Sequence, residues 1–206
     1  AVNSKVILSS SDYNDTTRAR SSKLGGGLFI FDTLSGRLNK KVTGSYRQIE
    51  IVGNKVFAIE YIDGALDIFD LELDQISRID LPGKNLCGLA FDPENEDFYI
   101  ANSGSDEIVK FSLHTEERYT FNHYVRKGSK REAHVNDLCF DNNKLFVSYF
   151  SASSNYKYGV FDGGVGVIDI ALEIDNKEVL KDLWKPHSPR ILDGNLYVLD
   201  SMRGEL

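Results

Sequence analysis

Two histidines in this chain stand next to polar residues that are suited to binding an anion. His134 is two residues before Asn136, so in an extended strand the two side chains point to the same side. His187 is three residues before Arg190, whose planar guanidinium can hold a carboxylate or phosphate through two parallel hydrogen bonds. The pattern predicts a ligand-binding site built from these four residues. Turn bonding and the lining of a channel are the simpler roles open to the same side chains.

Two further polar residues, Asn102 and Asp200, each end a short apolar run and are candidates for the same site. Both also fit the simpler role of accepting hydrogen bonds from the backbone of a turn. No nucleophile beside a base, zinc motif or catalytic carboxylate pair is identifiable by spacing, and whether the chain is an enzyme stays open.

A repeated pattern of strand, turn and strand positions these residues. Short apolar runs with an aromatic residue recur at residues 56–59, 98–101, 145–148 and 196–199, and each follows a turn rich in Gly, Asn or Asp. Another strand-like run precedes each turn, and further runs follow it. The aromatic residues of these runs are Phe57, Tyr99, Phe146 and Tyr197, which are spaced by roughly 40–50 residues, and we expect them to be buried.

Four short strands per repeat at this period are typical of β-propeller blades. We therefore predict an all-β fold of four-stranded antiparallel blades in an incomplete ring, with about four to five blades present and six in the full protein. One domain is expected over residues 1–206, cut short at its C-terminus. A five-bladed ring is the alternative if residues 5–42 and 187–206 complete each other. The nearest helix candidate, residues 170–183, is interpreted as a loop and a fourth strand.

In a propeller, the first strands of the blades line the central channel, and the loops that lead into them share one face with the loops between second and third strands. His134 and His187 would then lie at the same height on adjacent blades, with Asn102 and Asp200 at the same face. Two long loops, residues 11–27 and 151–164, would overhang it. Tyr156, Tyr158 and Phe161 of the second loop could stack on a sugar or a peptide side chain, or pack on their own blade.

Composition narrows the class of partner. The net charge of −7 argues against nucleic acid, whose binding depends on neutralised phosphates. No run approaches the roughly 20 apolar residues of a membrane-spanning helix, so no membrane partner is expected. No signal peptide is visible, and the compartment stays open with a weak preference for the cytoplasm. Cys87 and Cys139 lack metal-ligand spacing and are expected to behave as small buried residues, with a disulfide as the alternative.

One stretch of the chain resembles a known family. Residues 186–190 read PHSPR, residues 193–197 read DGNLY, and Ser201 is followed by Gly204-Glu205-Leu206. This order resembles the signature of an uncharacterised bacterial β-propeller family, a domain of unknown function, in which PHSPR is followed by DG-x-L-[WY] and S-x-x-GEL. The segment His134-Val135-Asn136 resembles the strand start H-x-N of the same family. The resemblance implies a bacterial propeller and no particular activity.

A wider resemblance is to propellers of the gluconolactonase and senescence-marker type. Residues 136–140 (NDLCF) and 197–201 (YVLDS) are similar to the repeats of those proteins. The resemblance implies a divalent metal on the propeller axis, with Asn136 and Asp200 among its ligands. A Ca²⁺ site at these two residues is therefore the alternative to a protein without a cofactor. The sequence departs from the pattern at Asp137, where the family has glycine, and no glutamate in the first blade completes the site.

These observations favour a non-catalytic propeller module that presents one face to a small polar or anionic ligand or to a protein partner. A metal-dependent hydrolase of lactonase type is the alternative, and a structural subunit of a larger assembly is a third interpretation.

Overall fold

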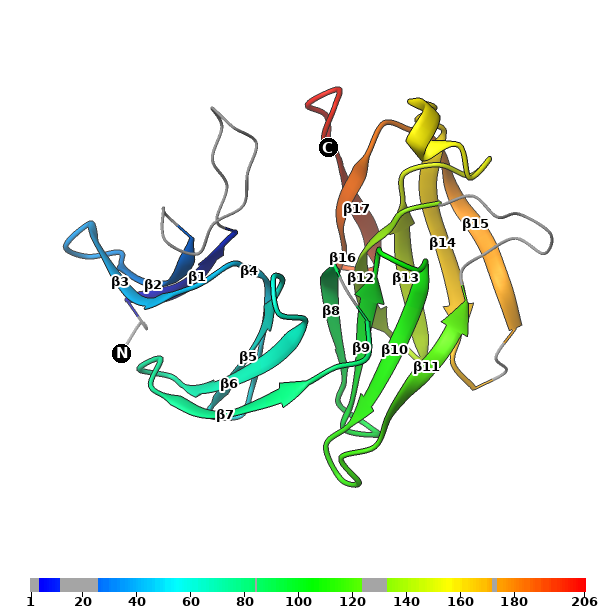
Figure 1. Ribbon diagram of the computed structural model, residues 1–206. Helices are drawn as coiled ribbons and strands as arrows, with labels where there is room; N and C mark the ends of the chain where they lie inside the picture. Colours follow the sequence, from blue (N-terminus) through cyan, green and yellow to red (C-terminus); the bar gives the residue numbers. More distant parts are fainter. Residues whose placement is uncertain (1–3, 12–25, 84, 124–132, 172–173) are drawn as a thin grey trace. The chain divides into compact units, whose positions relative to one another are not determined.

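The computed structural model describes residues 4–11, 26–83, 85–123, 133–171 and 174–206. The described residues form antiparallel strands and one short 3₁₀ turn, η1 (Tyr156–Tyr158) (Figure 1). Most of the loop expected over residues 11–27 lies outside them. The chain divides into two compact units, residues 1–81 (unit 1) and 82–206 (unit 2). The single domain predicted from the sequence stays a prediction.

Three four-stranded sheets are complete blades in which each strand pairs with the next one along the chain. The first is β4 (Tyr46–Val52), β5 (Lys55–Glu60), β6 (Ala65–Asp70) and β7 (Gln75–Asp80); the second is β8 (Leu86–Asp92), β9 (Asp97–Asn102), β10 (Glu107–Ser112) and β11 (Arg118–His123); the third is β12 (Val135–Asp141), β13 (Lys144–Tyr149), β14 (Gly163–Asp169) and β15 (Ile174–Leu183). Such meanders of four short strands are the units of β-propellers.

Two smaller sheets precede and follow the complete blades. One contains β1 (Lys5–Ser10), β2 (Gly27–Asp32) and β3 (Arg37–Thr43), and the other contains β16 (Pro186–Leu192) and β17 (Asn195–Asp200). The predicted fold class is confirmed: the chain is all-β, and its described residues form three complete and two partial antiparallel blades. The segment that came nearest to a helical pattern is strand β15, as expected.

Unit 1 packs its first complete blade around a buried hydrogen bond. The hydroxyl of Tyr46 donates to Oδ2 of Asp67 over 2.8 Å, and the Tyr46 ring meets Phe69 edge to face at 5.9 Å. Asp67 is 1% exposed, and burial raises the pKa of its carboxyl although the Tyr46 hydroxyl and Arg78 oppose this. A polar contact of this kind fixes the orientation of the inner strand β4.

In unit 2 the inner strands of successive sheets lie side by side, since β8 contacts β12 and β12 contacts β16 (Figure 1). The approach of β8 to β12 depends on Gly88: a Cβ atom there would lie 2.7 Å from Cα of Asp137. The core behind these strands contains Tyr99, Leu138 and Val147, each completely buried. The packing therefore holds the starts of β8, β12 and β16 in one row.

The expected burial of the repeated aromatic residues holds for Phe57 and Tyr99, holds in part for Phe146 and fails for Tyr197. Phe57 is 2% exposed and Tyr99 is fully buried, whereas Phe146 is half-buried. Tyr197 is 40% exposed, so its predicted burial is wrong. Its strand, β17, belongs to a two-stranded sheet, so no complete blade covers the ring. Cys87 and Cys139 are free thiols, and both are half-buried rather than buried.

Candidate functional site

The four residues predicted to form the site all belong to unit 2 and lie at β12 and β16. The side-chain amide nitrogen of Asn136 lies 2.5 Å from Nδ1 of His187, although the two residues are 51 positions apart. An amide nitrogen can only donate, so Nδ1 is the acceptor and the imidazole carries its proton on Nε2. Asn136 is 6% exposed, whereas His187 is half-buried, so this contact presents the imidazole and keeps the amide inside.

The register of the two strands differs from the one expected. Val135 pairs with Tyr149 and Pro186 with Asp200, so Asn136 and His187 are both second residues of their strands. His134 precedes its strand, where its φ of 59° matches the φ of 54° at Lys185 before β16. The expectation that His134 and His187 lie at the same height is therefore wrong. In strand position, His134 of the third complete blade is equivalent to Lys185 of the last sheet, and Asn136 is equivalent to His187.

His134 instead joins a group of stacked rings, which we call the ring ladder: His134, Phe150, Tyr156, Phe161 and His187. The ring of His134 stacks on Tyr156 with centroids 4.3 Å apart and lies 4.7 Å from Phe150. Phe150 meets His187 edge on at 5.1 Å, and Tyr156 meets Phe161 at 6.0 Å. Phe150 is 5% exposed, and the other four rings are half-buried. The ladder therefore presents aromatic faces on a buried base.

A cation lies against one end of this group. Nζ of Lys185 lies 4.6 Å from the ring centroid of Phe161, within the range of a cation–π contact. Lys185 is half-buried. It directly precedes β16 and has a left-handed backbone conformation. The ring ladder and Lys185 together offer flat apolar faces, two imidazoles and one ammonium group.

The loop that supplies Tyr156 and Phe161 is braced by Asp162. Oδ1 of Asp162 accepts hydrogen bonds from the hydroxyls of Ser151 at 2.7 Å and Ser153 at 3.2 Å. Oγ of Ser151 in turn accepts the backbone N–H of Asn155 at 3.0 Å. Partial burial would raise the pKa of Asp162, but these hydroxyls prevail and lower it. An ionised carboxylate thus holds Tyr156 over His134.

Asp106 fixes the backbone on both sides of His134. Its Oδ2 accepts the N–H of Ala133 at 2.6 Å, and its Oδ1 accepts the N–H of Val135 at 2.9 Å. Asp106 is 2% exposed and comes from the loop between β9 and β10, in the preceding blade. Sequence reasoning assigned no such role to this residue. The sequence around it, residues 102–106, has the composition of an ordinary turn and does not point to this role.

Asp137 and Arg190 meet at the boundary between β12 and β16. The carboxylate of Asp137 accepts the N–H groups of Leu138 at 2.8 Å and Ser188 at 3.2 Å. Burial raises the pKa of Asp137 to about 6, and the nearby charge of Arg190 acts in the opposite direction. Arg190 donates to the carbonyls of Pro189 at 2.6 Å and Leu138 at 3.3 Å. These bonds tie the two strands together, and a ligand contact by Arg190 stays a prediction.

Asn102 and Asp200 have turn-bonding roles. Oδ1 of Asn102 accepts the N–H of Gly104 at 3.2 Å. Oδ1 of Asp200 accepts the N–H of Trp184 at 3.0 Å, and its Oδ2 accepts from Arg203 at 3.2 Å. Both side chains are at most 3% exposed. Their predicted part in ligand binding, and the predicted metal ligation by Asn136 and Asp200, stay predictions. Over the described residues, no three His, Cys, Asp or Glu side chains are grouped closely enough to hold a metal ion.

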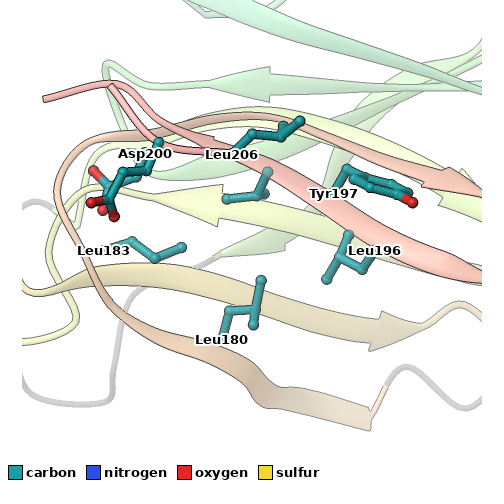
Figure 2. Close-up of a pocket in the computed structure, with 8 residues that line it drawn as sticks. Leu180, Leu183, Leu196, Tyr197, Asp200 and Leu206 are labelled. Atoms are coloured by element: carbon teal, nitrogen blue, oxygen red, sulfur yellow. The ribbon is translucent and has the colours of Figure 1, made fainter. Parts of the chain in front are cut away.

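A separate hollow lies beside Asp200 (Figure 2). It has a volume of about 370 Å³ and lies between β15 and β17. Figure 2 shows Leu180 and Leu183 of β15 facing Leu196 of β17, with Asp200 at one end. Because the walls are mainly leucine and the carboxylate is already bonded, this hollow is a poor match for a polar ligand. The ring ladder is the better candidate site.

The comparisons with known proteins bear on the fold. No protein-family model matches the sequence, and no curated protein matches it. Among solved structures, the chain is similar to one described as a nidogen/laminin complex, with a TM-score of 0.65 and 16% identity over 85% of this chain. It is also similar to the hydrazine synthase of Kuenenia stuttgartiensis, with a TM-score of 0.55 and 15% identity over 74% of this chain. At these identities the likeness shows the fold alone, and it agrees with a β-propeller.

The chain spans 64% of the length of the first of these structures and 43% of the second. Within the described part of the chain, no helix is long and apolar enough to cross a membrane.

Proposed function

We propose that this chain is a non-catalytic propeller binding module and that it holds a small, polar, anionic ligand at the ring ladder. The observation that supports this most directly is the stack of His134 on Tyr156 at 4.3 Å, next to the half-buried imidazole of His187. Half-buried rings that are braced from below offer a flat surface at little cost in conformational entropy.

The chemistry of the surface favours a ligand with both a flat face and a negative charge. Aromatic faces pack on sugar rings and on planar groups. Lys185 adds a positive charge at the same surface, in a protein whose net charge is −7. A local cation in an acidic protein attracts and orients an anionic group. A sugar acid combines both features and serves as the probe.

The experiment is a titration of the 206-residue protein with sodium glucuronate, with glucose as the neutral counterpart and sodium chloride as the ionic control. Trp184, the single tryptophan, directly precedes Lys185, so its fluorescence reports on this surface. We expect a saturable change in fluorescence with glucuronate. The affinity for glucose should be at least about tenfold lower, which corresponds to about 1.4 kcal/mol of binding free energy.

The variant Tyr156→Ala removes one face of the stack and should weaken glucuronate binding. The matched control is Tyr158→Ala on the same 3₁₀ turn, where the side chain is 74% exposed. Equal responses of the two variants, or no saturable response of the wild type to glucuronate or its neutral counterpart, would contradict the proposal. A protein partner is a second candidate, because the nidogen structure includes laminin, and an exposed ring face also suits a protein side chain.

The lactonase-type alternative depends on a metal at Asn136. Isothermal titration of the protein with calcium chloride distinguishes the two functions. Saturable binding that is lost in Asn136→Ala would support the hydrolase, whereas binding that is the same in this variant would place any calcium elsewhere. Hydrolysis of a lactone such as gluconolactone, measured with and without calcium, is the accompanying assay.

A further inference from the structure

A second site is indicated in unit 1, at an arginine whose buried Nε atom has no hydrogen-bond partner among the described residues. Arg47 is the second residue of β4, where it occupies the strand position that Asn136 and His187 occupy in β12 and β16. Its guanidinium carbon lies 4.4 Å from the ring centroid of Tyr61. Its Nε atom is buried and makes no hydrogen bond within the described residues. An arginine held in this way is oriented by stacking and left without a counterion.

The neighbouring acids are already committed to other groups. Glu60 pairs opposite Tyr46 and is 5% exposed, and its two carboxylate oxygens accept the N–H groups of Ser45 at 3.2 Å and Asp63 at 2.7 Å. The carboxylate of Asp63 forms an ion pair with Arg78 at 2.7 Å. Over the described residues, Arg47 has no ion pair with either of them. Its charge is therefore not balanced by direct contact.

The buried Nε–H of Arg47 is unfavourable for the folded protein, because burial removes its water and no described residue replaces it. Groups that reduce stability are often kept where function needs them. The guanidinium presents a fixed fork of donors, and Tyr61 holds its plane in place. That geometry matches an oxyanion, which can accept two parallel hydrogen bonds. Lysine at the same position would lack the fork.

We propose that Arg47, stacked on Tyr61, is an anion-binding site in unit 1 that receives a carboxylate or phosphate group of a ligand. All of its residues belong to unit 1, residues 1–81, whereas the ring ladder belongs to unit 2. The terminal nitrogens of the guanidinium contact the oxyanion, and the NMR resonance of the buried Nε–H group is sensitive to its binding. The two oxyanions differ in shape and charge, so separate titrations distinguish them.

The test is an NMR titration of the ¹⁵N-labelled 206-residue protein, with the Nε–H resonance of Arg47 assigned by its loss in Arg47→Lys. Inorganic phosphate and sodium acetate are added separately, each against sodium chloride at equal ionic strength. We expect a saturable shift of this resonance with phosphate, acetate or both, and none with chloride. A resonance that responds to neither oxyanion beyond the chloride effect would overturn the proposal. The variant Arg47→Lys serves only to assign the resonance, and the titrations use the wild-type protein.

Two variants separate ligand binding from a structural role. Arg47→Met should leave the apo protein at least as heat-stable as the wild type and abolish the rise in Tm that phosphate or acetate causes. A fall in Tm without any anion would mean that the guanidinium only supports Tyr61. Arg37→Lys, at an exposed position of β3, is the control and should keep the wild-type response. Trp184 fluorescence follows the ring ladder in the same samples, so failure at one site is seen separately from failure at the other.

Discussion

The amide of Asn136 and the imidazole of His187 touch at 2.5 Å between two neighbouring sheets, although the two residues are 51 positions apart in the chain. The contact is partly buried, and it links the inner strand of a complete blade to that of the next. We expect Asn136→Ala and His187→Ala each to destabilise the protein by about 1 kcal/mol, the usual size of such a bond.

The double variant tests whether the two effects share one cause. If the bond accounts for both, the double variant should lose about 0.5–1.5 kcal/mol less than the sum of the single losses. Urea unfolding of the four proteins measures this coupling. Strict additivity would mean that the two side chains contribute through separate neighbours.

The buried carboxyl of Asp137 makes the stability of the protein depend on pH. Burial raises its pKa from 3.8 to about 6 in the folded protein, so folding takes up a proton between these values. Stability attributable to this group is greatest below about pH 4 and falls as pH rises to about 6. In Asp137→Asn the slope over this window should disappear, and stability at pH 7 should rise by about 1–3 kcal/mol.

Arg190 provides the companion measurement, because its charge holds the pKa of Asp137 down. Arg190→Met should therefore extend the fall in stability to higher pH. Thermal unfolding at half-unit steps from pH 4 to 8 compares the three proteins. The comparison is between the curves of stability against pH. If the wild-type curve between pH 4 and 6 is flat, or has the same shape as the curve of Asp137→Asn, Asp137 is ionised throughout this range.

The repeat pattern predicted the blades because it depends on local chemistry. Turns rich in Gly, Asn and Asp, followed by short apolar runs, specify hairpins wherever they occur. The site was harder to predict, because its geometry depends on register. A bulge between Val135 and Asp137, and another between His187 and Arg190, shift the inner strands against their neighbours. A shift of one residue turns each side chain to the other face.

Contacts between residues of different blades could not be predicted from the sequence either. Asp106 bonds the backbone beside His134 from 27 and 29 positions away, and nothing in its local sequence distinguishes it from an exposed turn aspartate. The stacking of Tyr156 on His134 depends in turn on the loop braced by Asp162. Sequence reasoning named Tyr156 and His134 separately, whereas their partnership follows from the folded loop.

Asp106 gives a prediction that connects stability to the candidate site. In Asp106→Ala two buried N–H groups lose their acceptor, which we expect to cost about 2–6 kcal/mol because each unsatisfied group costs about 1–3 kcal/mol. The left-handed backbone of His134 would lose its support, so glucuronate binding should weaken as well.

The matched control is Asp63→Ala, in the equivalent loop of the first complete blade. There the side chain is 63% exposed and pairs with Arg78 at the surface, so the loss should stay within about 1 kcal/mol. Urea unfolding and the Trp184 titration are measured on both variants. Equal losses of stability would show that the bonds from Asp106 contribute no more than a surface ion pair.

The repeated aromatic residues provide the last prediction, because equivalent positions in the sequence differ in burial. Phe57 is 2% exposed among the buried residues of unit 1, so Phe57→Ala should destabilise the protein by about 3–5 kcal/mol through lost burial and the cavity left behind. Tyr197 is 40% exposed beside the hollow between β15 and β17, so Tyr197→Ala should cost about 1 kcal/mol or less. Urea unfolding of the 206-residue protein measures both. Comparable losses of stability for the two variants would mean that the Tyr197 ring is as well covered in solution as the Phe57 ring. The face of β17 that carries Tyr197 would then be covered rather than exposed.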